Sequence, residues 1–487
     1  LYPSADRELA QSVGSRHDYS DTHAVKALVA FQQGDYDKGV QETEESLNRM
    51  PDNQMALYNM GYYAAEMGDD RTALRYYLKV EPDYESGNAM LKTAYLHMKT
   101  GELKKAEESL LRLIKMQPRN AAVHFGLAEV YTKGFRFDEA IQLYHDVLKE
   151  PGKMSYRMDD EEKGVDIPKV EQSLEYVKAL KEKYQVAISA MEKGRSFEGH
   201  RTLAEIYITI GNLEMAEKEL KASLNNTDDI TPAELLLGEL YQKLGKDQEA
   251  EEIYIRLLRD KNSASLNVLV GAGTFYAKTL RFKEASELFQ LALKRRSRET
   301  GIMDHENPSP PPFFKGGPRG DLQVEKNPGD QQIREYLDWS IKLKKLLENS
   351  EQLKRSSHPI DAALIKADVY VSVGRKQDAI RELEHTLATD PDHRVLLKAL
   401  ASLYKTQGYP YWKRTIETYR HLLSLNENDA DAWRRLGEFY YTVIHDYENA
   451  LLCFQKSMSM NPKQEGAKKI RATIEKLQQY VNLHKEK

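Results

Sequence analysis

The sequence has very little of the residue type that builds disulfides and thiolate metal sites. Cys453 is the only cysteine among 487 residues, which excludes an internal disulfide and a metal site made of several cysteines. One cysteine also cannot distinguish a reducing from an oxidising compartment. Because Cys453 adjoins Phe454, we interpret it as a small buried hydrophobic residue, with a reactive thiol as the alternative.

The sequence also lacks an excess of positive charge and any long hydrophobic run. Lys and Arg number 71 against 76 Asp and Glu, giving a formal charge of −5, so no general nucleic-acid or anionic-membrane partner is expected. No stretch approaches the roughly 18 consecutive apolar residues of a membrane helix. The composition predicts a soluble helical protein. The chain begins at Leu1 without a Met or an apolar leader, which leaves room for a signal or anchor upstream.

Recognisable catalytic and cofactor motifs are missing as well. None of the 13 histidines stands in an H-E-x-x-H pattern, so no metal site is predicted. Gly271 and Gly273 lack the third glycine and the preceding strand of a dinucleotide site, and we assign them to helix packing. No Ser, His and Asp set and no carboxylate pair can be singled out. We therefore expect no enzyme activity, no metal and no cofactor.

The sequence does contain an alanine that recurs every 33 to 35 residues within each of two clusters, usually with a Gly about five residues before it and a Tyr about nine before it. The recurring residues are Ala73, Ala106, Ala140, Ala216, Ala250, Ala285, Ala379 and Ala450. In the copy at 233–262, an apolar stripe ends at Gly245 and resumes at Ala250. Such a unit is a helical hairpin, and a repeated hairpin buries its apolar face by stacking on its neighbours.

The last copy carries the pattern most completely, with Trp433, Leu436, Gly437, Tyr440, Ala450, Phe454 and Pro462. This pattern resembles the tetratricopeptide repeat (TPR). The resemblance implies an all-α, right-handed α-solenoid of about ten helical hairpins. The repeats start near Ser20, Gln54, Gly87, Ala121, Phe197, Thr231, Leu266, Ile360, Arg394 and Ala430.

Two inserts divide the predicted repeats into three blocks. The boundaries are an N-terminal segment at 1–19, four repeats at 20–154, a helical insert at 155–196, three repeats at 197–299, a Pro/Gly-rich loop plus a helix at 300–359, three repeats at 360–463, and a capping helix at 464–487. The loop resembles translated repetitive DNA of some bacterial genomes, which predicts a bacterial protein, and the sequence leaves the compartment open between cytoplasm and periplasm.

Two repeats depart from the pattern. Repeat one has Gly39 in place of the alanine, which we expect to weaken a terminal unit. Repeat nine carries about two extra residues around Tyr409, Pro410 and Tyr411, and it places Thr415 at the alanine position.

The resemblance also implies which residues line the concave groove, because the family presents ligand-facing positions on the first helix of each hairpin. The fifth positions are Tyr58, Leu91, Phe125, Arg201, Leu235 and Arg434. The ninth positions are Tyr62, Tyr95, Glu129, Glu205, Glu239, Asp368 and Glu438. The groove is thus expected to be aromatic early and acidic later. Ordinary helix pairs such as Glu129 with Lys133, and packing of the tyrosines between neighbours, are the alternatives.

The expected function is a noncatalytic scaffold or adaptor that binds a protein or peptide in this groove. The chaperone-tail clamp of some TPR proteins is not expected, because Lys398 is followed by Ser402 where an Asn is needed. Alternatives are a regulatory subunit or portion of a larger enzyme, and a part of a bacterial envelope or secretion assembly. The sequence leaves the partner and the oligomeric state open.

Overall fold

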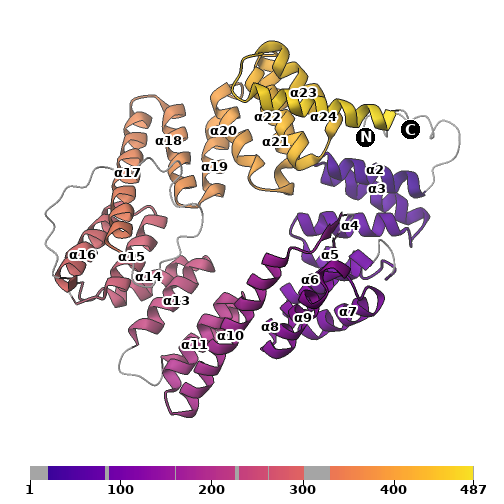
Figure 1. Cartoon of the computed structure of the whole chain (residues 1–487). Helices are drawn as coiled ribbons and strands as arrows, with labels where there is room; N and C mark the ends of the chain where they lie inside the picture. The colour runs from indigo at the N-terminus through magenta and orange to yellow at the C-terminus, as the bar shows by residue number, and fades with distance from the viewer. Residues whose placement is uncertain are drawn as a thin grey trace. The chain divides into compact units, whose positions relative to one another are not determined.

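A computed structural model of the protein describes residues 20–82, 87–158, 161–224, 230–261, 263–300 and 329–485. These residues form α-helices joined by short connections, together with one two-stranded hairpin (Figure 1). Within this described part of the chain, no helix is long and apolar enough to cross a membrane. The predicted segment 1–19 and the Pro/Gly-rich residues 301–328 lie outside it.

The chain divides into two compact units. Unit 1 comprises Leu1–Gly134, Gln142–Val170 and Leu387–Lys487, and unit 2 comprises Phe135–Ile141 and Glu171–Thr386. Each unit has its own buried apolar clusters.

The elements before α10 are α2 (Ser20–Gln32), α3 (Tyr36–Arg49), α4 (Gln54–Glu66), α5 (Asp70–Tyr77), α6 (Asn88–Lys99), α7 (Leu103–Met116), α8 (Ala121–Lys133), α9 (Phe137–Lys149), η2 (Pro151–Lys153), β1 (Ser155–Met158) and β2 (Glu161–Gly164). The next are α10 (Ile167–Glu192), α11 (Ser196–Thr209), α12 (Leu213–Ser223), α13 (Thr231–Lys243), α14 (Asp247–Leu257), α15 (Leu266–Lys278) and α16 (Phe282–Thr300). The last are α17 (Asp330–Arg355), α18 (Pro359–Ser372), α19 (Lys376–Leu387), α20 (Arg394–Lys405), η3 (Tyr409–Tyr411), α21 (Trp412–Leu425), α22 (Ala430–Phe439), η4 (Tyr440–Ile444), α23 (Tyr447–Met460) and α24 (Ala467–Lys485).

The repeat unit is a helical hairpin, and α13 with α14 shows why. Gly245 joins the two helices at φ +68°, a left-handed conformation that glycine adopts without steric cost. A Cβ on Gly238 would lie 3.2 Å from the ring of Tyr254, and Ala250 is fully buried. The first helices of all ten predicted hairpins begin within one residue of the predicted starts. The predicted all-α fold and α-solenoid of TPR-like hairpins are confirmed.

Gly39 in repeat one has a packing role. A Cβ on Gly39 would lie 2.3 Å from Cδ1 of Phe31. The Phe31 ring is fully buried and stacks on Tyr63, with 4.6 Å between ring centroids. The expectation that glycine weakens this repeat is therefore corrected, because glycine leaves the space that the ring fills.

We predict that Gly39→Ala lowers the free energy of unfolding by about 1–3 kcal/mol, because the added methyl overpacks against Phe31. Urea denaturation measures this loss. Gly152→Ala is the control, since nothing lies within 4 Å of a Cβ on Gly152. Equal stability of the wild type and the Gly39 variant would contradict the packing role.

The first insert contains a strand pair before its helix. β1 and β2 pair antiparallel, with Ser155 opposite Gly164, whereas the sequence predicted only a helical insert here. The alternation of polar and apolar residues around Tyr156 is the local signal for a strand. The 26-residue α10 follows and packs against α11. At this contact a Cβ on Gly199 of α11 would lie 2.4 Å from Cγ of Met191 of α10.

The connection before α9 also contacts α10. Phe135 adopts a left-handed φ of +60°, which is unfavourable for a side chain with a Cβ. Its ring contacts Tyr184 at 5.1 Å and Tyr207 at 5.0 Å. These aromatic contacts offset the strain of the turn and attach the inserted helix to the repeats of unit 2.

The helix of the second insert, α17, contacts the helices on both sides of it, α16 and α18. Ser340 near the middle of α17 lies 2.8 Å from the hydroxyl of Ser286 on α16. Ser350, further along α17, donates to the carbonyl of Ala362 on α18 at 3.0 Å. The α17 helix therefore fills the interval between repeats seven and eight.

The last repeat contains one residue more than the regular unit. The interval from Tyr440 to Ala450 is ten residues, whereas the interval from Tyr241 to Ala250 is nine. The extra residue lies in the π-helical turn η4, which is followed by His445 at φ +58°. After it, α24 packs on α23 as the predicted capping helix and buries Ile470, Leu477 and Val481.

Candidate binding surfaces

The predicted aromatic residues of α4 and α6 are shared between packing and surface. The half-buried ring of Tyr58 lies 5.7 Å from that of Tyr77 on α5. Tyr62 contacts the edge of Tyr63 at 5.0 Å, and the Lys92 ammonium lies 5.5 Å from its ring centroid. Leu91 is 3% exposed, so its side chain belongs to the core and presents almost no surface to a ligand.

The remaining two aromatic residues lie against neighbouring helices. Phe125 on α8 contacts Tyr144 on α9 at 5.7 Å. The hydroxyl of Tyr95 lies 3.6 Å from the position of a Cβ on Gly126. Both rings are half-buried, so packing between neighbours accounts for part of the predicted patch.

One depression on unit 2 is a cleft of about 210 Å³ between the first helices of consecutive repeats. It is lined by Lys183 of α10, by Glu205, Ile208 and Thr209 of α11, and by Leu236, Glu239, Leu240 and Lys243 of α13. Two of the predicted ninth-position residues, Glu205 and Glu239, therefore lie in one cleft. Lys183 was missed, because it lies on the inserted helix outside the repeat frame.

The charges of this cleft are balanced. The Lys183 ammonium lies 2.6 Å from a carboxylate oxygen of Glu205, whose side chain is 13% exposed. Glu239 shares the lining with Lys243, one turn further along α13. The predicted acidic groove is therefore neutralised here by lysines, while Ile208 supplies apolar surface.

The other predicted residues of the middle repeats lie outside this cleft. Glu129 forms the i, i+4 pair with Lys133 at 3.7 Å on the exposed surface of α8. The guanidinium of Arg201 lies 5.9 Å from the ring centroid of Phe197. The side chain of Leu235 faces α15, since its Cδ1 lies 3.0 Å from a Cβ on Gly271.

Asp368 on α18 also lies outside the cleft. Desolvation by neighbouring atoms raises the pKa of its carboxyl above the usual value.

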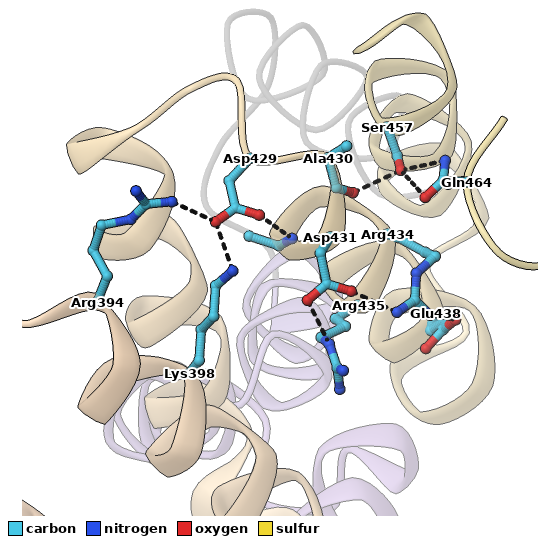
Figure 2. Close-up of polar contacts among 11 residues, drawn as sticks. Arg394, Lys398, Asp429, Ala430, Asp431, Arg434, Arg435, Glu438, Ser457 and Gln464 are labelled. Atoms are coloured by element: carbon cyan, nitrogen blue, oxygen red, sulfur yellow. Dashed lines mark hydrogen bonds and ion pairs between the residues drawn. The ribbon is translucent and has the colours of Figure 1, made fainter. Parts of the chain in front are cut away.

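The predicted residues of repeat ten belong to an ion-pair network on α22 (Figure 2). The Arg434 guanidinium contacts Glu438 at 2.5 Å and Asp431 at 2.6 Å. Arg435 also contacts Asp431, at 2.9 Å. These pairs are three or four residues apart on one helix, and such pairs form without any ligand.

Next to this network, a buried carboxylate connects repeats nine and ten (Figure 2). Asp429 accepts from Arg394 and Lys398 of α20, each at 2.8 Å, and its side chain is only 6% exposed. It also caps α22, as Asn53 caps α4 and Asn120 caps α8. The frame of groove positions missed Asp429, but the recurring N-cap just before a repeat is the signal that locates it.

The same contacts set the acidity of Asp429. Burial alone would raise the pKa of Asp429, but hydrogen bonds from Lys398, the α22 amide and Arg394 outweigh it and hold the pKa below the usual 3.8. Because the folded-state pKa is the lower one, the stabilisation is fully present above about pH 4 and is lost as the pH falls through the folded-state pKa.

We predict that Asp429→Asn lowers the free energy of unfolding at pH 7 by about 1–2 kcal/mol, since Asn keeps the helix cap but loses the charge. Urea denaturation at pH 7 and pH 3 measures it, and the gap to the wild type should shrink at pH 3. Asp431→Asn, in the more exposed network, should cost less than about 1 kcal/mol. A gap for Asp429→Asn that is equally large at pH 3 would contradict this account.

The cysteine and the packing glycine occupy structural positions. Cys453 is 3% exposed, and burial raises the pKa of its thiol to about 12, which suppresses the thiolate. A Cβ on Gly273 would lie 2.6 Å from the Phe289 ring, so this position requires a small residue. Among the described residues, no group of three or more His, Cys, Asp or Glu is placed to hold a metal ion.

Comparison with known proteins identifies the repeat. Residues 91–153 and residues 235–264 each match a model of the tetratricopeptide repeat. The chain therefore contains tetratricopeptide repeats, in unit 1 and in unit 2.

One curated relative is the human protein O-mannosyl-transferase TMTC1, which is 21% identical over 258 residues. The match covers 52% of this chain and 25% of the relative, so the chain spans about a quarter of that protein's length.

Solved structures also match along much of the chain. The TPR domain of P58(IPK) is 15% identical, with 96% of this chain and 99% of that chain covered and a TM-score of 0.21. A TPR protein from Parabacteroides merdae is 14% identical, with 66% and 98% covered and a TM-score of 0.27. Naa15/Naa10 bound to HypK-THB is 15% identical, with 96% and 67% covered and a TM-score of 0.22. At these TM-scores the fold assignment rests on the chain's own helices.

Proposed function

We propose that the protein is a noncatalytic scaffold that binds an extended segment of a partner protein in the cleft of unit 2. The observation that carries this proposal is the meeting of Glu205 and Glu239, the ninth positions of consecutive repeats, in one depression. Repeat surfaces of this kind present successive equivalent positions along a continuous binding face.

The size and lining of the cleft favour a peptide. Its volume of about 210 Å³ lies below the roughly 300–1,000 Å³ of small-molecule sites. It has room for one or two side chains of a longer ligand. Ile208 and Leu236 line it together with two lysines and two glutamates, so an apolar anchor residue flanked by charged residues is the complementary chemistry.

A basic flanking residue can be accommodated by exchange of partners. Lys183 is 39% exposed, so its ammonium can return to water when a ligand cation takes its place on Glu205. The largely buried Glu205 carboxylate then has a cation beside it before and after the exchange, so its charge stays paired. Glu205 and Glu239 are therefore the residues proposed to select a basic group beside the apolar anchor.

We predict that Glu205→Lys combined with Glu239→Lys weakens partner binding by more than about 1 kcal/mol, or about fivefold in Kd, and lowers the association rate. The partner is first captured with the full chain and identified by mass spectrometry, and binding is then measured by calorimetry and stopped flow. Added salt should reduce the difference in rate.

Glu129→Lys is the matched control, because Glu129 is the ninth position of a repeat outside the cleft. It should bind as the wild type does. Unchanged affinity in the double variant, with unchanged helicity by circular dichroism, would refute binding in this cleft.

A second proposal is that the chain is the repeat portion or regulatory subunit of a larger enzyme. It is favoured by the likeness to an O-mannosyl-transferase over a quarter of that protein's length. Capture of a glycosyltransferase by the full chain, with a change in its rate on binding, would support this proposal. Capture of partners without enzymatic activity would favour the scaffold.

The absence of catalysis in the chain itself remains part of the proposal, as does a bacterial source. The segment that suggested the source lies among residues 301–328, outside the described part of the chain. A role in an envelope or secretion assembly stays a prediction from the sequence.

A further inference from the structure

The two extra residues of repeat nine form a turn whose first side chain is almost fully buried. They lie in η3, between α20 and α21, where helix connections usually face solvent. Tyr409 is nevertheless 2% exposed. The repeat's own Trp412 contacts its ring at 4.9 Å, but that contact covers only part of it.

The rest of the burial comes from the first two repeats. The ring of Tyr409 lies 5.0 Å from that of Tyr63 on α4 and 6.4 Å from that of Tyr36 on α3. These residues form one buried cluster with Phe31 and Met60. Both sides of the contact belong to unit 1.

The backbones also meet at this point. A Cβ on Gly34 would lie 2.6 Å from the amide nitrogen of Lys413 and 2.9 Å from Cβ of Trp412. At the equivalent turn glycines Gly68 and Gly101, nothing described lies within 4 Å of such a Cβ. The contact is therefore particular to the first turn, and a 3.1 Å ion pair between Lys413 and Asp35 lies beside it.

We propose that the turn Tyr409–Trp412 is an intramolecular clasp that fastens repeat nine to repeats one and two and controls access to the aromatic surface of the N-terminal repeats. The length anomaly and the buried tyrosine occur in the same turn, so the two extra residues have a function that the repeat pattern does not explain. The segment that covers the aromatic surface is the chain's own turn at 409–412.

The chemistry of Tyr409 suits a contact that opens. Among the described residues, none forms a hydrogen bond with the buried Tyr409 hydroxyl. Burial of an unpaired hydroxyl is unfavourable, so the tyrosine binds less tightly here than a phenylalanine would. Opening would expose Phe31 and Tyr63 next to Tyr62, which packs on the same cluster. Detachment of the repeat-nine turn would thus expose the aromatic surface of repeats one and two.

Crosslinking within the full chain tests the clasp. Gln33→Cys and Lys413→Cys are introduced together with Cys453→Ala, so that only the two new thiols can react. Gln33 adjoins Gly34 and is exposed, and its replacement leaves the Asp35 cap in place. A short bismaleimide at low protein concentration should give an intramolecular product, identified by mass spectrometry.

Adding Tyr409→Ala should lower the intramolecular crosslinking rate by about tenfold or more, because the local concentration of the two thiols falls when the clasp opens. Tyr36→Ala should have the same effect from the other side of the contact. Tyr409→Phe should keep or raise the rate.

Tyr411→Ala is the matched control, since Tyr411 belongs to the same turn but stacks on Tyr404 of its own repeat at 5.4 Å. It should crosslink as the parent does. No intramolecular product in the parent, products only between two copies, or an unchanged rate in both Tyr409→Ala and Tyr36→Ala would overturn the clasp. Circular dichroism on each variant ensures that the comparison is made between folded proteins.

Discussion

The fold depends on the close approach of the two helices of a hairpin, and in several hairpins the absence of a Cβ on one helix makes room for an aromatic ring from the other. Gly238 faces Tyr254, Gly273 faces Phe289, and in each case the glycine is on the first helix and the ring on the second. Repeat one exchanges the two roles, with Gly39 on the second helix and Phe31 on the first. Both arrangements place a glycine opposite an aromatic ring, although the helices that carry the two residues are exchanged. Either arrangement fills the same space between the helices.

The helices were predictable from the sequence because this requirement recurs at a fixed spacing. A small residue and an aromatic residue, with a turn glycine in most repeats, indicate where each hairpin starts, so first helices from Ser20 to Ala430 begin within one residue of where the pattern places them. The extra residue of the last repeat is also visible in the sequence, since Tyr440 and Ala450 are ten residues apart instead of nine. The structure accommodates it in a π-helical turn. The β1–β2 pair was not predicted, because strands of four residues give too short an alternation to stand out beside the helical pattern of the same insert.

The candidate surfaces were predictable only where they follow the repeat. Glu205 and Glu239 occupy equivalent positions, so the family frame found both. Lys183 comes from an inserted helix, and its 2.6 Å contact with Glu205 depends on how that helix packs. The contact between Asp35 and Lys413 joins residues 378 positions apart, and no local pattern encodes such a pairing. Tertiary packing determines these contacts. An insert has no sequence repeat from which its packing could be predicted.

The shared helix α17 has a consequence for how unit 2 unfolds. Stacked repeats behave as a row of neighbours whose interfaces set the cooperativity of unfolding, and a gap in the row divides it into blocks that melt separately. Here the repeat pattern is interrupted between α16 and α18, yet α17 contacts both through Ser340 and Ser350. We therefore expect α17 to carry cooperative unfolding across the interruption, so that α15 to α18 unfold together.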